Sequence, residues 1–180
     1  MLQQTSYVAD AGRVADLQRD IRSGALTARV LVERCLARIE ATDPAVQAWR
    51  YVAHDTARVE ADLLDREAKA GHFRGPLHGI PVGIKDIIDV AGMTTLANSK
   101  SRVNSAPATA DAEIVAALRL AGAVVLGKTH TTEFAFFDPS PTRNPRNIAH
   151  TPGGSSSGSA AAVGGGCVPL AVGTQTVASA

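Results

Sequence analysis

The sequence has few aromatic residues, only two cysteines, and no marked excess of charge of either sign. Its eighteen basic and seventeen acidic residues are scattered along the chain, which argues against nucleic acid or an anionic membrane as a partner. The first residues lack the basic and apolar segments of a signal peptide, and no apolar run is long enough to cross a bilayer. We therefore expect a cytoplasmic protein that binds a small molecule and contacts neither nucleic acid nor membrane.

Cys35 and Cys167 lie far apart in the sequence, and neither has a second cysteine at CxxC spacing. Both have apolar neighbours, and free cysteines are often buried as small hydrophobic residues. We therefore expect two reduced, buried thiols, while a disulfide or a metal site is the less favoured alternative.

Four segments carry apolar residues at helical spacing, three of them within residues 1–70. Asp10 and Thr27 are suited to cap the first two helices, and Asp43-Pro44 is expected to end the second. The charges of these helices are expected to form solvated faces, so residues 1–70 are interpreted as a helical lead-in without catalytic groups. The four helices are predicted at about 12–23, 28–43, 55–70 and 111–122.

Short apolar segments rich in β-branched residues alternate with these helices, and most of them lie within residues 71–180. Such alternation predicts an α/β fold. Within residues 75–90 we expect two short strands that meet at a bend near Lys85-Asp86. Further strands are predicted at about 46–52, 123–127 and 168–172, and a short helix through Phe136 precedes a long irregular loop at 138–152.

Lys85 is a candidate functional residue because it lies among apolar residues rather than on a charged surface. Strand alternation puts Ile80, Val82 and Ile84 on one face. It places Lys85 on the other face, beside Gly83, which has no side chain to block access. A lysine buried among isoleucines would be unfavourable in its charged form. The alternative is a surface lysine whose aliphatic part covers apolar neighbours.

A run of glycine and serine at residues 153–159 continues into apolar residues instead of a polar linker, so we interpret it as a site. Its glycines allow backbone N–H groups to approach a ligand, and its serines supply hydroxyls. A phosphate-binding loop is disfavoured because Gly158 is not followed by a lysine. The Gly-x-Ser-x-Gly pattern centred on Ser156 is typical of α/β-hydrolases. It is also disfavoured, because a polar segment precedes it where a strand is required.

Three separated segments contain the lysine, a helix followed by a strand, and the glycine and serine run: Gly79–Asp86, Leu118–Thr129 and Pro152–Ala161. Together with Gly173–Thr176, they closely resemble the amidase signature family. The resemblance extends from about Val14 to the last residue and implies an α/β amidase-signature fold with a mixed central β-sheet flanked by helices. Residues 1–180 would form the N-terminal part of a single amidase domain, incomplete at the C-terminus, and no metal or organic cofactor is implied.

The resemblance also implies a Ser-Ser-Lys triad that hydrolyses a carboxamide to a carboxylic acid and ammonia or an amine, through an acyl-enzyme. Lys85 matches the base, Ser155 matches a bridging serine preceded by a cis peptide bond, and Ser179 matches the nucleophile. A neutral, desolvated lysine can take a proton from a serine through such a bridging hydroxyl. Ser156 is expected to add a supporting hydrogen bond. Backbone N–H groups of Thr176, Val177, Ala178 and Ser179 would hold the oxyanion.

Two departures from the family pattern bear on this activity. Val177-Ala178 replaces the usual Gly-Gly before the nucleophile, and a valine would be strained if this turn needs a positive φ. The family's domain also continues well beyond its nucleophile, so the sheet is expected to have an exposed edge. The first alternative is therefore a non-catalytic, truncated remnant that acts by binding or association.

Another alternative is the A-type subunit of a glutamine-dependent tRNA amidotransferase. It is disfavoured because residues 127–134 depart from the Asn-Met-Asp-Glu-Phe form of that branch. Lys128 and His130 in this segment are expected near the site, in structural roles. The implied partner of the favoured hydrolase is a small amide, and self-association into a homo-oligomer is left open.

Overall fold

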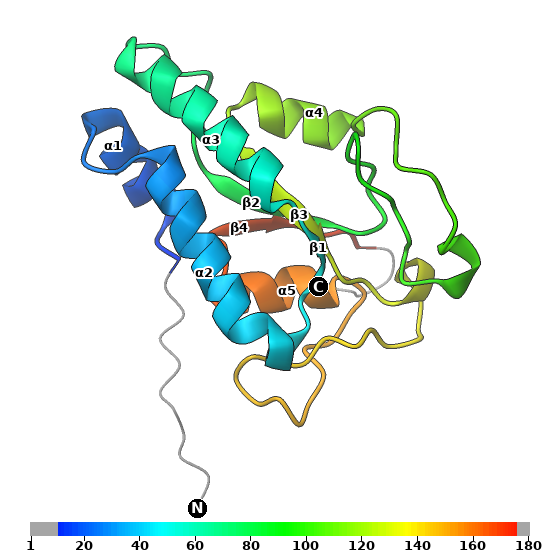
Figure 1. The fold of residues 1–180 in the computed structure, drawn as a ribbon. Coiled ribbons are helices and arrows are strands. Elements are labelled where there is room, and N and C mark those ends of the chain that lie inside the picture. The colour runs from blue at the N-terminus through cyan, green and yellow to red at the C-terminus, as the bar shows by residue number, and fades with distance from the viewer. Residues whose placement is uncertain (1–10, 176–180) are drawn as a thin grey trace, which may run out of the picture.

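A computed structural model describes residues 11–175, which form a mixed α/β arrangement of helices around a four-stranded sheet (Figure 1). This confirms the expected fold class. The predicted cap Asp10 and the residues Thr176 to Ser179 lie outside the described residues. The elements are α1 (Val14–Ser23), α2 (Ala28–Val46), β1 (Trp49–Val52), α3 (His54–Lys69), β2 (Pro81–Lys85), α4 (Glu113–Leu120), β3 (Val124–Thr129), α5 (Ser157–Gly164) and β4 (Leu170–Val172), with short 3-10 turns at Lys100–Arg102 and Glu133–Ala135.

The strand order is β1-β3-β2-β4, so β2 and β3 are central and β4 lies at one edge. β1 is antiparallel to β3, whereas β2 runs parallel to both β3 and β4. In this register Lys85 is paired with Thr129, and Ile84 is paired with Val172. The carboxyl ends of the three parallel strands therefore meet at the same end of the sheet, where loops commonly carry functional groups.

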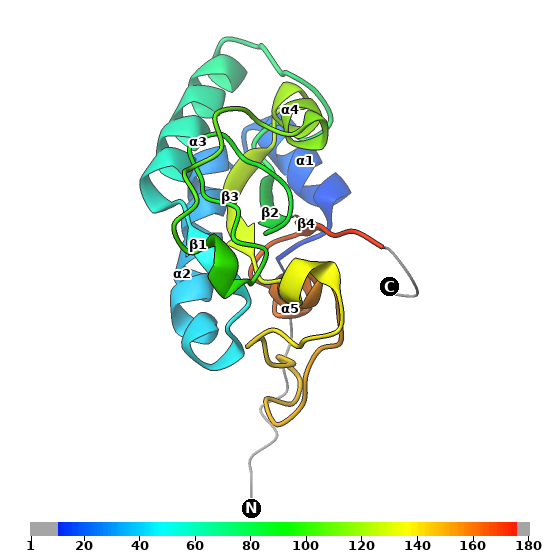
Figure 2. The same ribbon diagram turned by 90° about the vertical axis from the view of Figure 1, so that its right-hand side faces the viewer.

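Two clusters of buried apolar side chains cover the sheet. One cluster joins α1, α2, α3 and α5 to the sheet and includes Val124 and Leu126. The other joins α4 and the segment after β2 to the sheet and includes Val125. Since neighbouring residues of a strand point to opposite faces, the two clusters lie on opposite sides of the sheet. Helices α2 and α3 pack side by side along it in both views (Figure 1, Figure 2).

The four predicted helices are confirmed, but the expected end of the second one is wrong. α2 continues through Pro44 to Val46 and ends at Gln47, whose backbone N–H bonds to the Asp43 carbonyl. The Asp43 carboxylate also accepts hydrogen bonds from the N–H groups of Ala48 and Trp49. These bonds satisfy the backbone after the helix, so a proline in the last turn is tolerated. Thr27 caps α2 as predicted, because its side chain accepts a hydrogen bond from the Val30 N–H.

The prediction of two strands within residues 75–90 is also wrong. Only β2 forms there, because the N–H groups of Ile87 and Ile88 both bond to the carbonyl of Lys85 and turn the chain away from the sheet. Ile80 also departs from the expected alternation. It joins the cluster with α2, while Val82 and Ile84 join the cluster with α4.

Cys35 and Cys167 are both buried and free, as predicted. Within residues 11–175, no helix combines the length and apolar character needed to cross a membrane.

Candidate active site

Lys85 lies at the carboxyl end of β2 with its side chain fully buried. Its Nζ donates hydrogen bonds to the hydroxyls of Ser155 at 2.8 Å, Ser156 at 2.9 Å and Thr174 at 2.7 Å. The alternative of a lysine that reaches the surface is therefore wrong. Three segments that are distant in sequence meet at this amine: the end of β2, the start of α5 and the segment that follows β4.

Burial lowers the pKa of the Lys85 amine from its usual value of 10.5 to about 8, because the charged form loses its hydration. In the part of the chain that the structure describes, Lys85 forms no ion pair with a carboxylate. Hydroxyl partners leave the amine able to lose its proton, whereas a carboxylate would favour the charged form.

The glycine and serine run reaches the lysine through a cis peptide bond between Gly154 and Ser155. The cis bond lies where the resemblance predicts it. The Ser155 carbonyl accepts hydrogen bonds from the Thr132 N–H at 3.0 Å and from the Thr131 hydroxyl at 3.1 Å, so the segment after β3 holds this turn. A side chain at Gly154 would approach the Thr132 methyl group to 2.7 Å, which explains why glycine is needed beside the turn.

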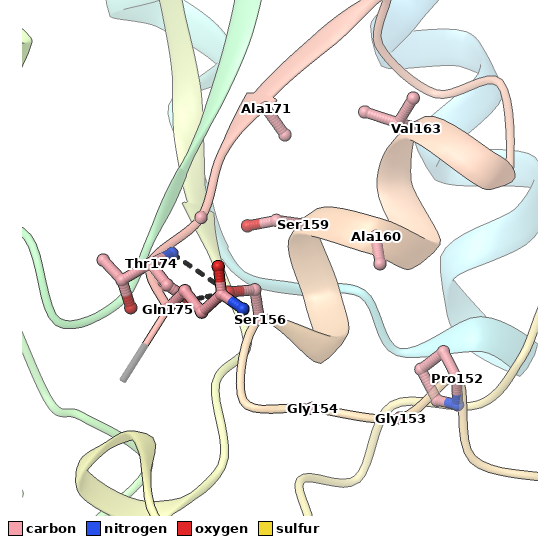
Figure 3. Close-up of a pocket in the computed structure, with 11 residues that line it drawn as sticks. Pro152, Gly153, Gly154, Ser156, Ser159, Ala160, Val163, Ala171, Thr174 and Gln175 are labelled. Carbon is pink, nitrogen blue, oxygen red and sulfur yellow. Dashed lines mark hydrogen bonds between the residues drawn. The ribbon is translucent and has the colours of Figure 1, made fainter. Parts of the chain in front are cut away.

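The two serines next to Lys85 have different hydrogen-bond partners. The Ser156 hydroxyl accepts a bond from the Thr174 N–H and donates one to the Thr174 carbonyl, both at 3.1 Å (Figure 3). Its single proton is therefore engaged, and toward Lys85 it acts as an acceptor. The Ser155 hydroxyl has Lys85 as its only partner within residues 11–175. Its proton is free to be passed to another group.

Further hydroxyl contacts join α5 to the sheet next to this cluster. Ser159 on α5 lies 2.7 Å from the Thr129 hydroxyl and donates a hydrogen bond to the Val172 carbonyl at 2.8 Å. A cavity of about 600 Å³ lies between α5 and β4, and its lining includes Ser156, Ser159, Ala171 and Thr174 (Figure 3). Of the three residues whose hydroxyls contact Lys85, Ser156 and Thr174 thus line the cavity.

The structure brings together Lys85, Ser155 and Ser156 among the residues predicted from the sequence. Thr176, Val177, Ala178 and Ser179 lie outside the described residues, so their roles remain predictions. Sequence reasoning missed Thr174 as a partner of Lys85. A threonine after a glycine at a strand end has no pattern that distinguishes it. Only its place within Gly173–Thr176, one of the segments that carry the resemblance, could have indicated a role.

The α/β-hydrolase alternative at Ser156 is contradicted by the chain that leads to it. That arrangement needs a strand directly before the serine. Here residues 138–156 form an irregular loop with one isolated bridge, between Asn144 and Asn147.

Lys128 is a second buried lysine, on β3, and its surroundings differ from those of Lys85. Its Nζ lies 2.9 Å from the Asp86 carboxylate and donates a hydrogen bond to the Thr95 hydroxyl at 2.9 Å. Both charged side chains are almost completely excluded from solvent. Lys128 therefore belongs to a buried ion pair, which fits the structural role expected for it.

A buried amine beside hydroxyls and a glycine-rich turn is an arrangement suited to activating a hydroxyl as a nucleophile. Comparison with known proteins agrees with this arrangement, because the family model for amidases matches residues 30–180. The chain belongs to the amidase family.

Individual relatives are similar to nearly the whole chain. AmiB2 of Mycobacterium tuberculosis, which is named as a putative amidase, is 45% identical over 93% of this chain and 37% of its own length. A glutamyl-tRNA(Gln) amidotransferase subunit of Rhodopirellula baltica is 41% identical over 90% of this chain and 34% of its own length. The structure of a peptide amidase from Stenotrophomonas maltophilia matches 92% of this chain and 36% of its own chain, with a TM-score of 0.83 and 41% identity. The chain thus spans little more than a third of the length of these relatives.

Proposed function

We propose that this protein hydrolyses the amide bond of a small carboxamide, with Lys85 as the general base, Ser155 as the proton relay and Ser179 as the nucleophile. The observation that supports it most is the fully buried Lys85 amine, which contacts three hydroxyls and no carboxylate among the described residues. A serine hydroxyl needs a base to become nucleophilic, and an amine with a lowered pKa can serve as that base near neutral pH.

In the proposed reaction the Ser179 oxygen attacks the carbonyl carbon of the amide. The proton of Ser179 passes to Ser155 while the proton of Ser155 passes to Lys85. Ser179 thus loses its O–H bond, Ser155 exchanges one O–H bond for another, and the amine gains one proton. The tetrahedral intermediate collapses to an acyl-enzyme as the C–N bond breaks, and the leaving amine takes the proton that Lys85 gained, passed back through Ser155. Water then attacks the acyl-enzyme and gives up a proton to the same relay. The bond to Ser179 breaks, the Ser179 oxygen takes that proton back, and the acid is released.

The free proton of Ser155 favours this serine as the relay. Ser156 donates its own proton to the Thr174 carbonyl, so it holds Lys85 in place but does not pass a proton to it. Backbone N–H groups of residues 176–179 are the proposed oxyanion donors. The proposed site requires Val177-Ala178 to keep these N–H groups directed at the oxyanion.

Two other functions make different predictions. A protein that only binds would not react covalently at Ser179. A component of a tRNA-dependent amidotransferase would release ammonia from glutamine, and the similarity to the amidotransferase protein from Rhodopirellula baltica motivates including glutamine as a substrate. The favoured hydrolase would act on simple carboxamides in preference to glutamine.

The test measures two quantities on the 180-residue chain and on the same chain joined to the remaining two thirds of a relative's domain. One is ammonia release from aliphatic amides, aromatic amides, peptide amides and glutamine. The other is covalent labelling by a fluorophosphonate, located by peptide mass spectrometry. We expect labelling at Ser179 and its loss in Ser179→Ala and Lys85→Met.

Ser157→Ala serves as a matched control, because the Ser157 hydroxyl has no hydrogen-bond partner within the described residues. Activity that survives Ser179→Ala or Lys85→Met would contradict the triad. No labelling and no ammonia release in either form of the chain would favour the binding-only alternative. Activity confined to glutamine would favour the amidotransferase.

A further inference from the structure

Thr174 supplies the third hydroxyl at the Lys85 amine, and the proposed proton transfer does not use it. Strand β4 runs beside β2 as far as Val172, whose carbonyl accepts a hydrogen bond from the Ser159 hydroxyl at 2.8 Å. Just beyond this strand, the N–H and the carbonyl of Thr174 both bond to the Ser156 hydroxyl at 3.1 Å. The Thr174 hydroxyl is therefore held in a fixed position, 2.7 Å from the Lys85 amine.

The three hydroxyls around Lys85 match the charged form of the amine one for one. An ammonium group has three protons and no lone pair, and the hydroxyls of Ser155, Ser156 and Thr174 all lie within hydrogen-bond distance of it. A neutral amine has two protons and one lone pair, so it donates two hydrogen bonds and accepts one. When Lys85 is neutral, two of the hydroxyls therefore act as acceptors, and the third can donate its proton to the nitrogen.

The direction of each bond to the neutral amine follows from the other contacts of the hydroxyls. Ser156 donates its proton to the Thr174 carbonyl, so toward Lys85 it is an acceptor. The Ser155 hydroxyl has no second partner within residues 11–175, and the proposed relay requires that it donate to the amine. Thr174 is then the second acceptor. In this arrangement each proton of the neutral amine has an acceptor, and the lone pair is directed at Ser155.

We propose that Thr174 is a positioning residue for the base: together with Ser156 it accepts both protons of the neutral Lys85 amine, so that the lone pair of the nitrogen is directed at the Ser155 hydroxyl. Thr174 exchanges no proton itself and acts on the proposed reaction through Lys85. The inference rests on the proposed roles of Lys85 as the base and Ser155 as the relay.

Thr174→Val keeps the shape of the side chain and removes its hydroxyl. The rate of Ser179 labelling or amide hydrolysis, measured at a pH where Lys85 is neutral, should fall by about tenfold. The reason is that the amine is no longer held with its lone pair toward Ser155. Thr174→Ser keeps the hydroxyl and should restore most of the rate.

Thr129→Val is the matched control, because it removes a buried threonine hydroxyl from the strand next to β2. This hydroxyl contacts Ser159 and does not contact Lys85. The control should leave both the reaction rate and the titration of Lys85 unchanged.

The titration of Lys85 separates a lost acceptor from a disturbed site. Hydrogen bonds from the charged amine are stronger than those from the neutral amine, so loss of an acceptor in Thr174→Val should lower the Lys85 midpoint by roughly half to one pH unit. Disturbed packing that admits water would instead raise the midpoint toward 10.5, because burial is the cause of the lowered pKa of Lys85. The midpoint is followed by NMR of the lysine Cε–Hε groups in protein carrying 13C-labelled lysine, with the exposed Lys69 and Lys100 as internal references.

Few charged groups could obscure this shift, since burial is the only cause of the lowered pKa of Lys85 within the described residues. Of the elements packed against β2, α5 and β4 contain no titratable side chain, and β3 contains only Lys128, which is paired with Asp86. None of the substitutions changes a charge. The other titratable groups on α2, on α4 and on the segments that adjoin β2, β3 and β4 are Arg29, Glu33, Arg34, Cys35, Arg38, Glu40, Asp43, His78, Asp89, Glu113, Arg119, His130 and Cys167.

A slower reaction with a lower midpoint in Thr174→Val, and a return of both in Thr174→Ser, support the proposal. A rate loss equal to that of Ser155→Ala would overturn it, because Thr174 would then pass the proton itself. An unchanged rate, a midpoint that rises, or an equal effect of Thr129→Val would also overturn it. If Thr174→Val does not fold, Thr174→Ala is measured in its place, with the same expected shifts.

The same measurements separate failure of this inference from failure of the proposed function. If the unsubstituted protein is labelled at Ser179 and Thr174→Val reacts equally fast, only the role of Thr174 is wrong. If the unsubstituted protein is not labelled at Ser179 in either form of the chain, the proposed function fails, and the inference fails with it.

Discussion

Lys85 and Lys128 are both fully buried, and they lie on neighbouring strands of one sheet, yet their surroundings differ in kind. Lys85 contacts three hydroxyls, whereas Lys128 contacts a carboxylate and one hydroxyl. A hydroxyl can either accept or donate a hydrogen bond, so it can serve both the charged and the neutral form of an amine. A carboxylate stabilises only the charged form.

The difference shows that burial alone does not make a lysine a base. The nature of the partner decides whether burial produces a group that titrates near neutral pH or a fixed charge within an ion pair. The two lysines also separate function from stability, because removal of each should affect mainly one of them.

Lys85→Met should lower the rate of Ser179 labelling or amide hydrolysis by roughly a thousandfold, the scale of a lost general base. The free energy of unfolding should change little, because methionine fills a similar volume and removes an amine whose charged form is disfavoured by burial. Labelling kinetics and urea unfolding of the same variant measure the two effects. A large loss of stability in Lys85→Met would remove the distinction between the two lysines.

Lys128→Met should lower the free energy of unfolding by about 3–5 kcal/mol, because it leaves the buried Asp86 carboxylate without its partner. The double variant Asp86→Asn/Lys128→Met should recover part of this loss, since no unpaired charge remains. Urea unfolding of the two variants provides the comparison. If the single variant is as stable as the unsubstituted protein, the ion pair has no structural role.

Gly158→Ala should lower the free energy of unfolding by about 2 kcal/mol or more. A side chain at this position would collide with the Ala48 carbonyl and the backbone of His130, both of which are main-chain groups that cannot move aside easily. Gly164→Ala at the other end of α5 is the matched control, because it meets only Pro145 at 3.9 Å. It should be neutral or slightly stabilising. Equal effects of the two substitutions on thermal unfolding would contradict the close approach of α5 to the backbone of Ala48 and His130.

Ser156→Ala should cost about 1 kcal/mol of stability, through loss of its two bonds to the backbone of Thr174. The proposed reaction should slow by about tenfold, because Lys85 loses one of the acceptors that hold it. A complete loss of activity, equal to that of Ser155→Ala measured in parallel, would show that Ser156 takes part in the proton transfer after all.

Local patterns in the sequence were sufficient for most of the fold. The spacing of apolar residues predicted α1 to α4 because each amphipathic helix is determined by residues within a few turns of one another. The end of α2 was mispredicted because the groups that stabilise the backbone after Pro44 come from Asp43 and the following residues, in a geometry that no propensity describes. The predicted second strand after Lys85 is absent for a similar reason, because the N–H groups of Ile87 and Ile88 both bond to the Lys85 carbonyl.

The site depended on contacts between residues far apart in the chain. Lys85 and Ser155 are separated by 70 positions, and Lys128 bonds to Thr95 across 33 positions. Periodicity carries no information about such pairs, so the residues alone left a buried base and a surface lysine open for Lys85. The resemblance to the amidase signature family supplied the pairing of Lys85 with Ser155. The contact of Thr174 with Lys85 and the ion pair between Asp86 and Lys128 are evident only in the folded structure.

The most direct test is the titration midpoint of Lys85 in the unsubstituted protein, measured from its Cε–Hε resonances across the range from neutral to strongly basic pH. We predict a midpoint of about 8. Because the folded value lies below the usual 10.5, the unfolded chain binds more protons in that range, so stability should also rise as the pH increases from about 8 to 10.5. A midpoint at or above 10.5 would contradict the assignment of Lys85 as a base.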